Sequence, residues 1–330
     1  MGGMTTKIGI PRALAYFTFF PLWITFFEQL NMDVMVSSES NKQVLDQGVK
    51  ETVNDACIPI KIYHGHVKDL TGKVDYLFVP RLVSLDGEET VCPKFLGLPD
   101  MVRYSIEGLP PLIDERLDLR KGRFELWKFF YRIGRTFNKG FLEIFKAYQV
   151  ACREYQKYRN LLTQGFTPQN AWEALRGEKN LDSNNNKTQS EDISIALLGY
   201  PYTIYDSYIS VGLFERLKNM GVNVLTKDNV PPQELLKQRK NFSKEMFWYY
   251  SNQVARAALY YLDKPRVNGV IHVTAFGCGP DAMVDKLVEL ECKQNGVPFL
   301  TLSLDEHTGE AGVGTRVEAF VDMLKRKRGL

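Results

Sequence analysis

Apolar residues in the first hundred positions form short continuous runs that are separated by longer stretches with helical spacing. The runs at 7–10, 32–37 and 74–80 predict strands, and the last is typical of a strand buried on both faces of a parallel sheet. The stretches at 13–27, 41–52 and 60–70 have the spacing of helices. This alternation predicts a doubly wound α/β unit.

The same order of elements returns after residue 190. Strands are predicted at 193–199, 222–226 and 269–276, with helices at 209–221 and 251–263 between them. The segments FFEQLNMDVMVS and LFERLKNMGVNVLT match in pattern, which indicates an internal duplication. A helix, a strand and a closing helix complete the second half, at 281–295, 298–304 and 315–325. The predicted fold class is therefore α/β, with two flavodoxin-like parallel-sheet domains.

The region between the two halves has a different pattern. Residues 110–180 carry aromatic residues at spacings of three and four, which predicts helices with an aromatic stripe along one face. Such a stripe is more typical of a packing face than of a binding surface. No apolar residue lies between Leu181 and Ile193, so this run is predicted to be a surface loop or linker. We predict an N-terminal domain at 1–109, a helical connecting region with its linker at 110–190, and a C-terminal domain at 191–330.

Composition narrows the class of protein. Apolar residues make up 44% and aromatic residues 12% of the chain, enough to fill two cores, and the net charge of +3 is too small and scattered for a nucleic-acid binder. No secretory signal and no stretch of 18 apolar residues occurs, so we expect a cytoplasmic protein without a membrane segment. Five dispersed cysteines argue against a disulfide framework.

Three of these cysteines are candidates for a shared metal centre. Cys57, Cys92 and Cys278 each lie beside proline or glycine near a predicted strand end or helix start, whereas Cys152 and Cys292 lie inside helical patterns. Functional groups in open α/β sheets collect beyond the carboxyl ends of the strands, so the three thiols could face one cleft. The alternative is three unrelated buried cysteines.

The type of centre follows from the spacing of the thiols. A structural zinc site would favour a C-x-x-C pair, which is absent, whereas iron–sulfur clusters accept dispersed thiolates. A cysteine nucleophile is disfavoured, because His64 is seven residues from Cys57 on one predicted helix, too far for a hydrogen bond.

Several charged residues are further candidates for this cleft. Arg12 and Arg81 each follow a proline at a predicted strand end, where they could bind an anion or form an ion pair, and Lys94 follows Cys92 by two residues. The glycine-rich segment 305–316 suits an anion-binding turn or a simple loop. Within it, Glu306, His307 and Glu310 are the candidate proton donors and acceptors.

Other polar residues of the second half are better explained by packing. His272 lies within an apolar strand and is predicted to be a hydrogen-bonded core residue. Four tyrosines crowd the first strand–helix turn of the second half. They could line a pocket or pack between the domains, and we favour packing: Tyr200, Tyr202, Tyr205 and Tyr208.

Six long motifs resemble a known family. They are IGIPRAL, ACIPIKIYHGHV, FVPRLVS, CPKFLGLPDM, TAFGCGPDAMV and DEHTGEAGVGTRVEAFVDML. Together they resemble the domain of unknown function found alone or fused in CoA enzyme activases. More distantly, they are similar to subunits of 2-hydroxyacyl-CoA dehydratases and benzoyl-CoA reductases, and to double-cubane cluster proteins. The match covers most of 7–104 and 192–325.

The resemblance implies two flavodoxin-like domains that hold an iron–sulfur cluster. Carried across, it makes Cys57, Cys92 and Cys278 the ligands of one [4Fe-4S] cluster, because a double cubane would need about six thiolates. It implies an ATP-dependent, actin-like activase as the partner that supplies low-potential electrons, since this chain has no P-loop of its own.

The resemblance leaves the activity itself open. The expected activity is electron transfer, or the reduction or dehydration of a small substrate, for which a CoA thioester is one candidate. The alternatives are a ligand-binding module without redox activity and a regulatory partner of the activase. A homodimer also stays open.

Overall fold

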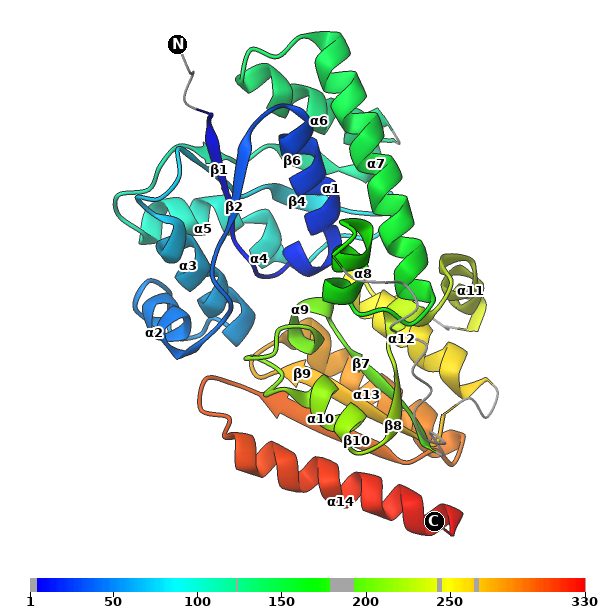
Figure 1. Ribbon diagram of the computed structural model, residues 1–330. Helices are drawn as coiled ribbons and strands as arrows, with labels where there is room; N and C mark the ends of the chain where they lie inside the picture. Colours follow the sequence, from blue (N-terminus) through cyan, green and yellow to red (C-terminus); the bar gives the residue numbers. More distant parts are fainter. Residues whose placement is uncertain (1–4, 123, 179–192, 242–244, 264–266, 330) are drawn as a thin grey trace. The chain divides into compact units, whose positions relative to one another are not determined.

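The computed structural model describes residues 5–122, 124–178, 193–241, 245–263 and 267–329 of the chain. The predicted linker run, residues 181–192, lies outside the described residues. The chain divides into two compact units (Figure 1). Unit 1 comprises residues 1–158 and 247–249, and unit 2 comprises residues 159–246 and 250–330.

Unit 1 is built on a parallel sheet of four strands, in the order β2-β1-β3-β5 among the described residues. The central strand β1 pairs with β2 on one side and with β3 on the other. The strands β4 and β6 pair separately in a second parallel sheet. The strands are β1 (Lys7–Ile10), β2 (Asp33–Val36), β3 (Tyr76–Phe78), β4 (Arg81–Ser84), β5 (Leu112–Ile113) and β6 (Arg116–Asp118). The helices are α1 (Tyr16–Gln29), α2 (Lys42–Lys50), α3 (Ile58–Leu70), α4 (Pro93–Leu96), α5 (Leu98–Ser105), η1 (Leu119–Lys121), α6 (Phe124–Thr136) and α7 (Phe141–Thr163), whose end belongs to unit 2.

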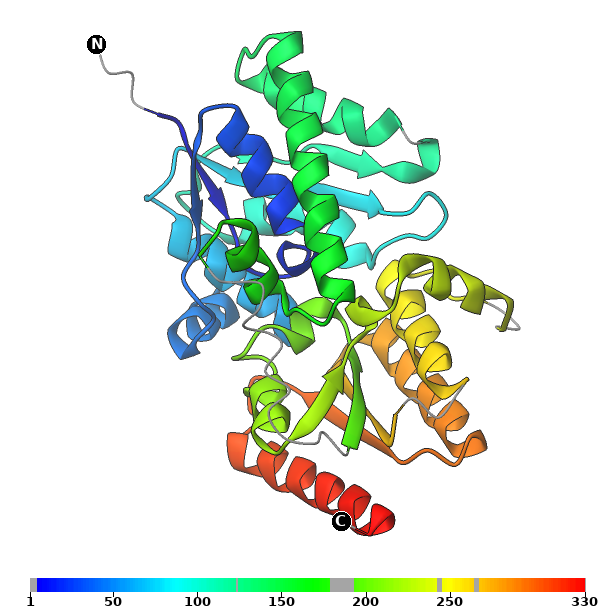
Figure 2. The same ribbon diagram turned by 45° about the vertical axis from the view of Figure 1, so that its right-hand side comes forward.

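Aromatic side chains form much of the core of unit 1. The predicted aromatic helix is α1, and most of its residues are buried. The ring of Phe78 on β3 contacts the rings of Trp23 and Phe27 on α1, with centroids 5.0 and 5.3 Å apart. Figures 1 and 2 show α7 beside α1, and the rings of Phe19 and Tyr155 join these two helices at 5.8 Å. The aromatic stripe of the connecting region is therefore a packing face at this point.

Unit 2 contains a second parallel sheet of four strands, in the order β10-β9-β7-β8 among the described residues. Every residue of β9 is buried, as expected for a central strand of a parallel sheet. The strands are β7 (Ile193–Gly199), β8 (Val222–Leu225), β9 (Gly269–Ala275) and β10 (Phe299–Leu304). The helices are α8 (Pro168–Leu175), α9 (Pro201–Ile204), α10 (Leu213–Asn219), η3 (Lys227–Asn229), α11 (Pro232–Lys237), η4 (Gln238–Asn241), α12 (Tyr249–Leu262), α13 (Gly279–Gln294) and α14 (Glu310–Arg328).

The two main sheets have the same topology. When each sheet is read from its second strand, the order is second, first, third and fourth strand in both units. The order therefore reverses between the first and third strands, which is the switch point at which flavodoxin-like folds place their ligands. This confirms the predicted fold class of two doubly wound α/β domains and agrees with an internal duplication.

The helical prediction for 110–180 is wrong at its start. Residues 112–113 form β5, which pairs in parallel with β3, and residues 116–118 form β6. Pro110 and Pro111 precede β5, and a proline pair disfavours a helix while it permits extended backbone. The helices of the connecting region begin only with η1 and α6.

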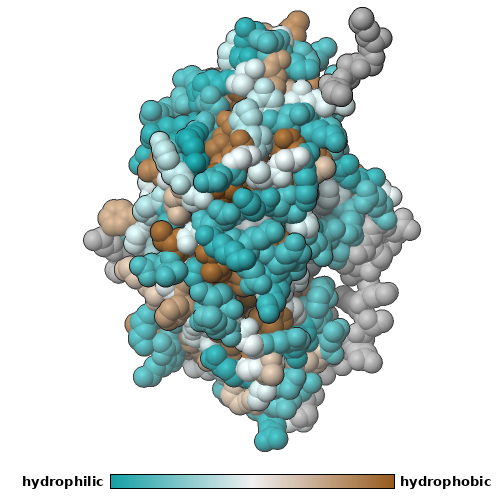
Figure 3. All heavy atoms as spheres, turned by 90° about the vertical axis from the view of Figure 1, so that its left-hand side faces the viewer, coloured by the Kyte–Doolittle hydropathy of each residue, from teal (hydrophilic) through white to brown (hydrophobic). Residues whose placement is uncertain are grey.

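The surface offers little continuous apolar area on the face seen in Figure 3. Hydrophilic residues predominate there, and hydrophobic residues lie among them in small groups. Among the described residues, no helix combines the length and the hydropathy that a membrane span requires.

Candidate functional site

Each of the three candidate cysteines occupies the N-cap of a helix. Cys57 precedes α3, Cys92 precedes α4 and Cys278 precedes α13. A proline follows each cysteine in the first turn, where the missing N–H costs no intrahelical hydrogen bond. A thiol at an N-cap lies next to N–H groups that have no partner within the helix. The predicted helix starts are confirmed for all three cysteines.

Lys94 and Cys92 both lie near Cys57 in unit 1. The Nζ atom of Lys94 lies 3.9 Å from the Sγ atom of Cys57. Burial raises the pKa of Cys57, and the nearby Cys92 raises it further, whereas Lys94 lowers it. Burial also raises the pKa of Cys92. A hydrogen bond from the backbone N–H of Lys94 and the charge of the Lys94 side chain lower this pKa, but by less. Both cysteines are therefore thiols near neutral pH, and a metal would have to displace their protons.

Cys278 belongs to unit 2 and is partly buried. It follows β9 across the short connection Phe276–Gly277, in which Gly277 has a φ of +74°. This left-handed glycine turns the chain sharply from the strand into α13. Cys278 therefore lies just beyond the carboxyl end of the central strand β9, where open α/β sheets collect functional groups.

The donor chemistry fits an iron–sulfur cluster in part. Thiolates are the usual protein ligands of such clusters, and the charge of Lys94 beside Cys57 would offset the negative charge of a cluster. Within either unit, however, the described residues contain no group of three metal-ligating side chains. The meeting of Cys57 and Cys92 with Cys278 stays a prediction.

Both candidate arginines form ion pairs. Arg81 donates two hydrogen bonds to the carboxylate of Asp100 on α5, at 2.7 and 2.9 Å, and a third to the carbonyl of Leu96. Arg12 pairs with Glu39 at 3.1 Å. The sequence left two roles open for these arginines, anion binding and an ion pair, and the structure shows the ion pair. Anion binding by Arg12 or Arg81 stays a prediction.

Of the candidate proton-transfer residues, Glu306 and His307 lie between β10 and α14, and Glu310 is the first residue of α14. The hydroxyl of Thr308 and the backbone N–H of His307 both donate to the carboxylate of Asp305, which orders this turn. The side chain of His307 is exposed. Glu310 accepts a hydrogen bond from Arg216 at 2.8 Å. Nothing in this geometry tests a catalytic role for Glu306, His307 or Glu310.

His272 is a core residue, as predicted. It is fully buried, and its Nδ1 atom lies 2.7 Å from the carboxylate of Asp285. Its Nε2 atom faces the fully buried Asp281 at 3.4 Å, too long for a good hydrogen bond. Burial would lower the pKa of His272, but the two carboxylates outweigh it and raise the pKa to about 9. Asp281 lies in the first turn of α13, so the charged imidazole ties the helix of Cys278 to β9.

Tyr200 also serves packing. Its ring contacts the rings of Tyr202 and Tyr250, with centroids 5.5 and 5.8 Å apart, and its hydroxyl lies 2.8 Å from that of Ser251. The packing alternative is therefore confirmed for Tyr200 and Tyr202.

A second buried histidine was not recognised from the sequence. His66 on α3 lies between two serine hydroxyls, with Nδ1 at 2.9 Å from Ser37 and Nε2 at 2.9 Å from Ser40. The hydroxyl of Ser37 also accepts a hydrogen bond from the backbone N–H of Arg12. Burial lowers the pKa of His66 to about 4.

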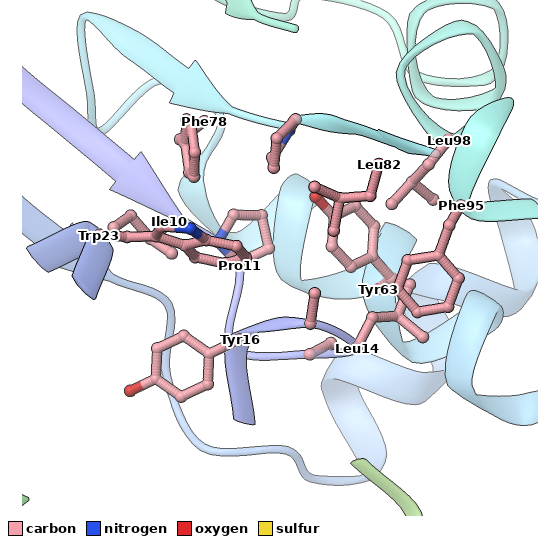
Figure 4. Close-up of a pocket in the computed structure, with 13 residues that line it drawn as sticks. Ile10, Pro11, Leu14, Tyr16, Trp23, Tyr63, Phe78, Leu82, Phe95 and Leu98 are labelled. Atoms are coloured by element: carbon pink, nitrogen blue, oxygen red, sulfur yellow. The ribbon is translucent and has the colours of Figure 1, made fainter. Parts of the chain in front are cut away.

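An apolar pocket lies at the switch point of the sheet of unit 1. Its enclosed volume is about 10 Å³, room for about one water molecule, and its empty space reaches about 290 Å³ only when the part open to solvent is included. Figure 4 shows side chains from the ends of β1 and β3 gathered around it, together with side chains from α3 and α4. The pocket thus lies against the two helices that Cys57 and Cys92 cap. Its lining residues are Ile10, Pro11, Ala13, Leu14, Ala15, Tyr16, Trp23, Tyr63, Phe78, Pro80, Leu82, Phe95 and Leu98.

Comparison with known families identifies the chain. The family described as the CoA enzyme activase uncharacterised domain matches residues 7–230, which is more than half of the sequence. The chain belongs to this family. A second family, the 2-hydroxyglutaryl-CoA dehydratase D-component, matches residues 179–324. No curated protein matches the sequence.

The two matches divide the candidate cysteines between them. Cys57 and Cys92 lie in the part that matches the activase-associated family, and Cys278 lies in the part that matches the dehydratase component. The matches confirm the resemblance noted from the motifs. They relate this member of the activase-associated family to dehydratase-like proteins that work with CoA enzyme activases.

Proposed function

We propose that this member of the activase-associated family is an iron–sulfur protein in which Cys57, Cys92 and Cys278 hold one [4Fe-4S] cluster. The observation that carries the proposal is the capping position that the three thiols share, each with a proline in the first helical turn. Neither of the other cysteines has this position, since Cys152 lies within α7 and Cys292 within α13. The donor type and the nearby Lys94 support the same assignment.

In this proposal, the two α/β domains at 1–109 and 191–330 each contribute ligands, and the region 110–190 connects them. An ATP-dependent, actin-like activase supplies low-potential electrons. The protein then transfers these electrons, or uses them to reduce or dehydrate a small substrate. Arg12, Arg81 and Lys94 offset the charge of the cluster or of the substrate, and Glu306, His307 and Glu310 are the candidates for proton transfer.

Anaerobic reconstitution with iron and sulfide tests the cluster. We expect about four iron atoms per chain and a broad absorption at about 400 nm, both of which a [4Fe-4S] cluster produces. Cys57→Ala, Cys92→Ala and Cys278→Ala should each lower the bound iron at least several-fold, because each removes a ligand. The readouts are iron analysis and the visible spectrum.

The two remaining cysteines provide matched controls. Cys152→Ala and Cys292→Ala change the same chemical group at positions within helices, so they should leave the iron content unchanged. A colourless, iron-free wild-type protein after reconstitution would refute the proposal. Equal loss of iron in the control variants would refute the assignment of the ligands.

The apolar pocket supports a second candidate function, a ligand-binding module without redox activity. It lies at the position where related topologies bind small molecules, and it needs no metal. Ligand binding by a protein that takes up no iron would favour this alternative. A complex with the activase that forms only with one nucleotide state would favour a regulatory partner.

A further inference from the structure

Part of the aromatic stripe of the connecting region lies on the surface of unit 1. Trp127 on α6 is at the centre of a group of rings whose centroids are 5.4 to 5.7 Å from its own. These rings belong to Tyr131 on α6 and to Phe141, Phe145 and Tyr148 on α7. Figures 1 and 2 show α6 beside the N-terminal part of α7. We call these five residues the aromatic patch.

Large apolar side chains of the aromatic patch are open to solvent. Phe141 is 56% exposed and Phe145 is 38% exposed, and Leu142, which lies between them in the sequence, is 70% exposed. Grouped exposed apolar side chains are typical of interaction sites, and aromatic residues dominate the energetics of protein interfaces. The patch therefore differs from the part of α7 that packs on α1 through Tyr155.

The helices that carry the aromatic patch are strongly basic. Residues 119–158 contain ten lysines and arginines and three glutamates, which gives a net charge of +7, whereas the whole chain has a net charge of +3. The rest of the chain is therefore net negative, and α6 and α7 carry a local positive excess.

Exposed cations account for this excess. The three glutamates of the region each form an ion pair with a lysine three or four positions away. Among the described residues, no carboxylate pairs with four exposed cations of the region, which are Lys121, Arg135, Lys146 and Arg153. Lys146 directly follows Phe145, and Arg135 follows Tyr131 by one helical turn. Exposed positive charge therefore borders the aromatic rings.

These surroundings distinguish between the classes of partner. A second copy that presents the same face would bring two positive surfaces together, which is unfavourable. A helix that binds lipid buries its apolar face about 5 to 10 Å deep, whereas the rings of Trp127, Tyr131 and Tyr148 are only partly exposed and lie against their neighbours. A protein surface with carboxylates around an apolar centre complements both the rings and the cations.

The backbone of the patch favours a helix as the partner segment. Because α6 and α7 use their N–H and C=O groups within the helices, the patch offers only side chains. A segment that packs on it must satisfy its own backbone hydrogen bonds, as a helix does and a single strand does not. The patch covers about two turns of α7, which matches apolar anchors spaced three and four residues apart on a helix.

We propose that the aromatic patch binds an acidic amphipathic helix of a partner protein. Apolar side chains of that helix cover the rings of Phe141 and Phe145, and its carboxylates pair with Arg135 and Lys146. The patch contains none of the three candidate cluster cysteines, so this interaction does not depend on the iron–sulfur assignment.

Synthetic peptides test the proposal on the full-length protein. Two peptides of about 20 residues have leucines along one helical stripe, and their polar positions are glutamate and glutamine in one and lysine and glutamine in the other. In fluorescence anisotropy at about 50 mM NaCl, the glutamate peptide should bind with a dissociation constant below about 100 μM. The lysine peptide should bind at least about 10-fold more weakly, because it meets the exposed cations.

Variants separate the rings from the charges. Phe145→Ala should weaken binding of the glutamate peptide at least about 5-fold, and Arg135→Glu combined with Lys146→Glu at least about 10-fold. Tyr104→Ala and Lys293→Glu are the matched controls, because these residues are exposed on α5 and α13, outside the patch. Each control should change binding by less than about 2-fold. Circular dichroism checks folding, and the charge reversal alters exposed positions only.

Three results would overturn the proposal. The first is that the glutamate peptide does not bind the wild-type protein, and the second is that both peptides bind equally. The third is that the patch variants and their controls have equal effects. Sedimentation with vesicles of about 30% phosphatidylglycerol in phosphatidylcholine tests the lipid alternative. Vesicle binding that the charge reversal removes, together with no peptide binding, would assign the patch to a membrane surface instead.

Discussion

At the scale of single residues, Leu14 and Val211 have left-handed backbones, with φ values of +53° and +56°. Each lies in the connection that follows the first strand of its unit. Two asparagines also have positive φ values, but asparagine tolerates this region well, whereas a β-branched valine is a clear outlier there. Leu14 lies two residues before α1 and Val211 lies two residues before α10, so each unit stores strain just before a helix that follows its first strand.

The strain at Val211 can be measured with two substitutions. Val211→Gly and Val211→Ala both remove the branched side chain, but only glycine relieves the left-handed backbone. We expect Val211→Gly to unfold with a free energy about 1 kcal/mol higher than Val211→Ala. Urea unfolding of both variants measures this difference. Equal stability of the two variants, or a more stable alanine variant, would contradict the strain.

At the scale of elements, the contact of α2 with α3 positions the N-cap Cys57. Two glycines allow the helices to approach closely. A Cβ atom added to Gly48 would lie 1.8 Å from the carbonyl oxygen of Lys61, and one added to Gly65 would lie 1.9 Å from that of Val44. Neither backbone oxygen can move without shifting a helix. Any side chain at these positions would therefore displace α3 and its capping thiol.

Gly48→Ala should accordingly lower the free energy of unfolding by about 3 kcal/mol, as overpacking against backbone does. Gly312→Ala is the control, because Gly312 lies within α14 and a Cβ atom there meets nothing within 4 Å. That variant should be more stable by about 0.5 to 1 kcal/mol, the helix propensity of alanine over glycine. Thermal unfolding distinguishes the two. A Gly48→Ala protein as stable as the wild type would refute the close approach.

At the scale of the whole molecule, a buried histidine of unit 1 and one of unit 2 favour different charge states. His66 in unit 1 lies between the hydroxyls of Ser37 and Ser40, and burial favours its neutral form. His272 in unit 2 lies between the carboxylates of Asp281 and Asp285, which favour its charged form. The two units should therefore respond to pH in opposite directions.

The sign of each response follows from the pKa values. His66 has a pKa of about 4 when folded and about 6.5 when unfolded, so its contribution is full above pH 6.5 and is lost as the pH falls toward 4. His272 has a pKa of about 9, so its contribution is full below pH 6.5 and is lost as the pH rises through 9. Each change amounts to roughly 3 kcal/mol.

NMR titration of the two imidazoles checks this prediction directly. His66→Gln and His272→Gln assign the signals and serve as controls. We expect the His66 signal to keep its neutral shift down to about pH 5, and the His272 signal to keep its charged shift up to about pH 8. Midpoints near 6.5 for both histidines would contradict the described environments.

The sequence alone determined β1, β2 and β3, the four strands of unit 2, most helices and the positions of the three cysteines at helix starts, because periodicity, proline and capping act within a few residues. It missed β4, β5 and β6, and the pairing of β5 with β3 involves residues more than 30 positions apart. Only the tertiary structure brought Ser37 to His66, Asp281 to His272, and the ends of β1 and β3 to one pocket. These contacts depend on strand order and on helix packing, which join residues that no local pattern connects.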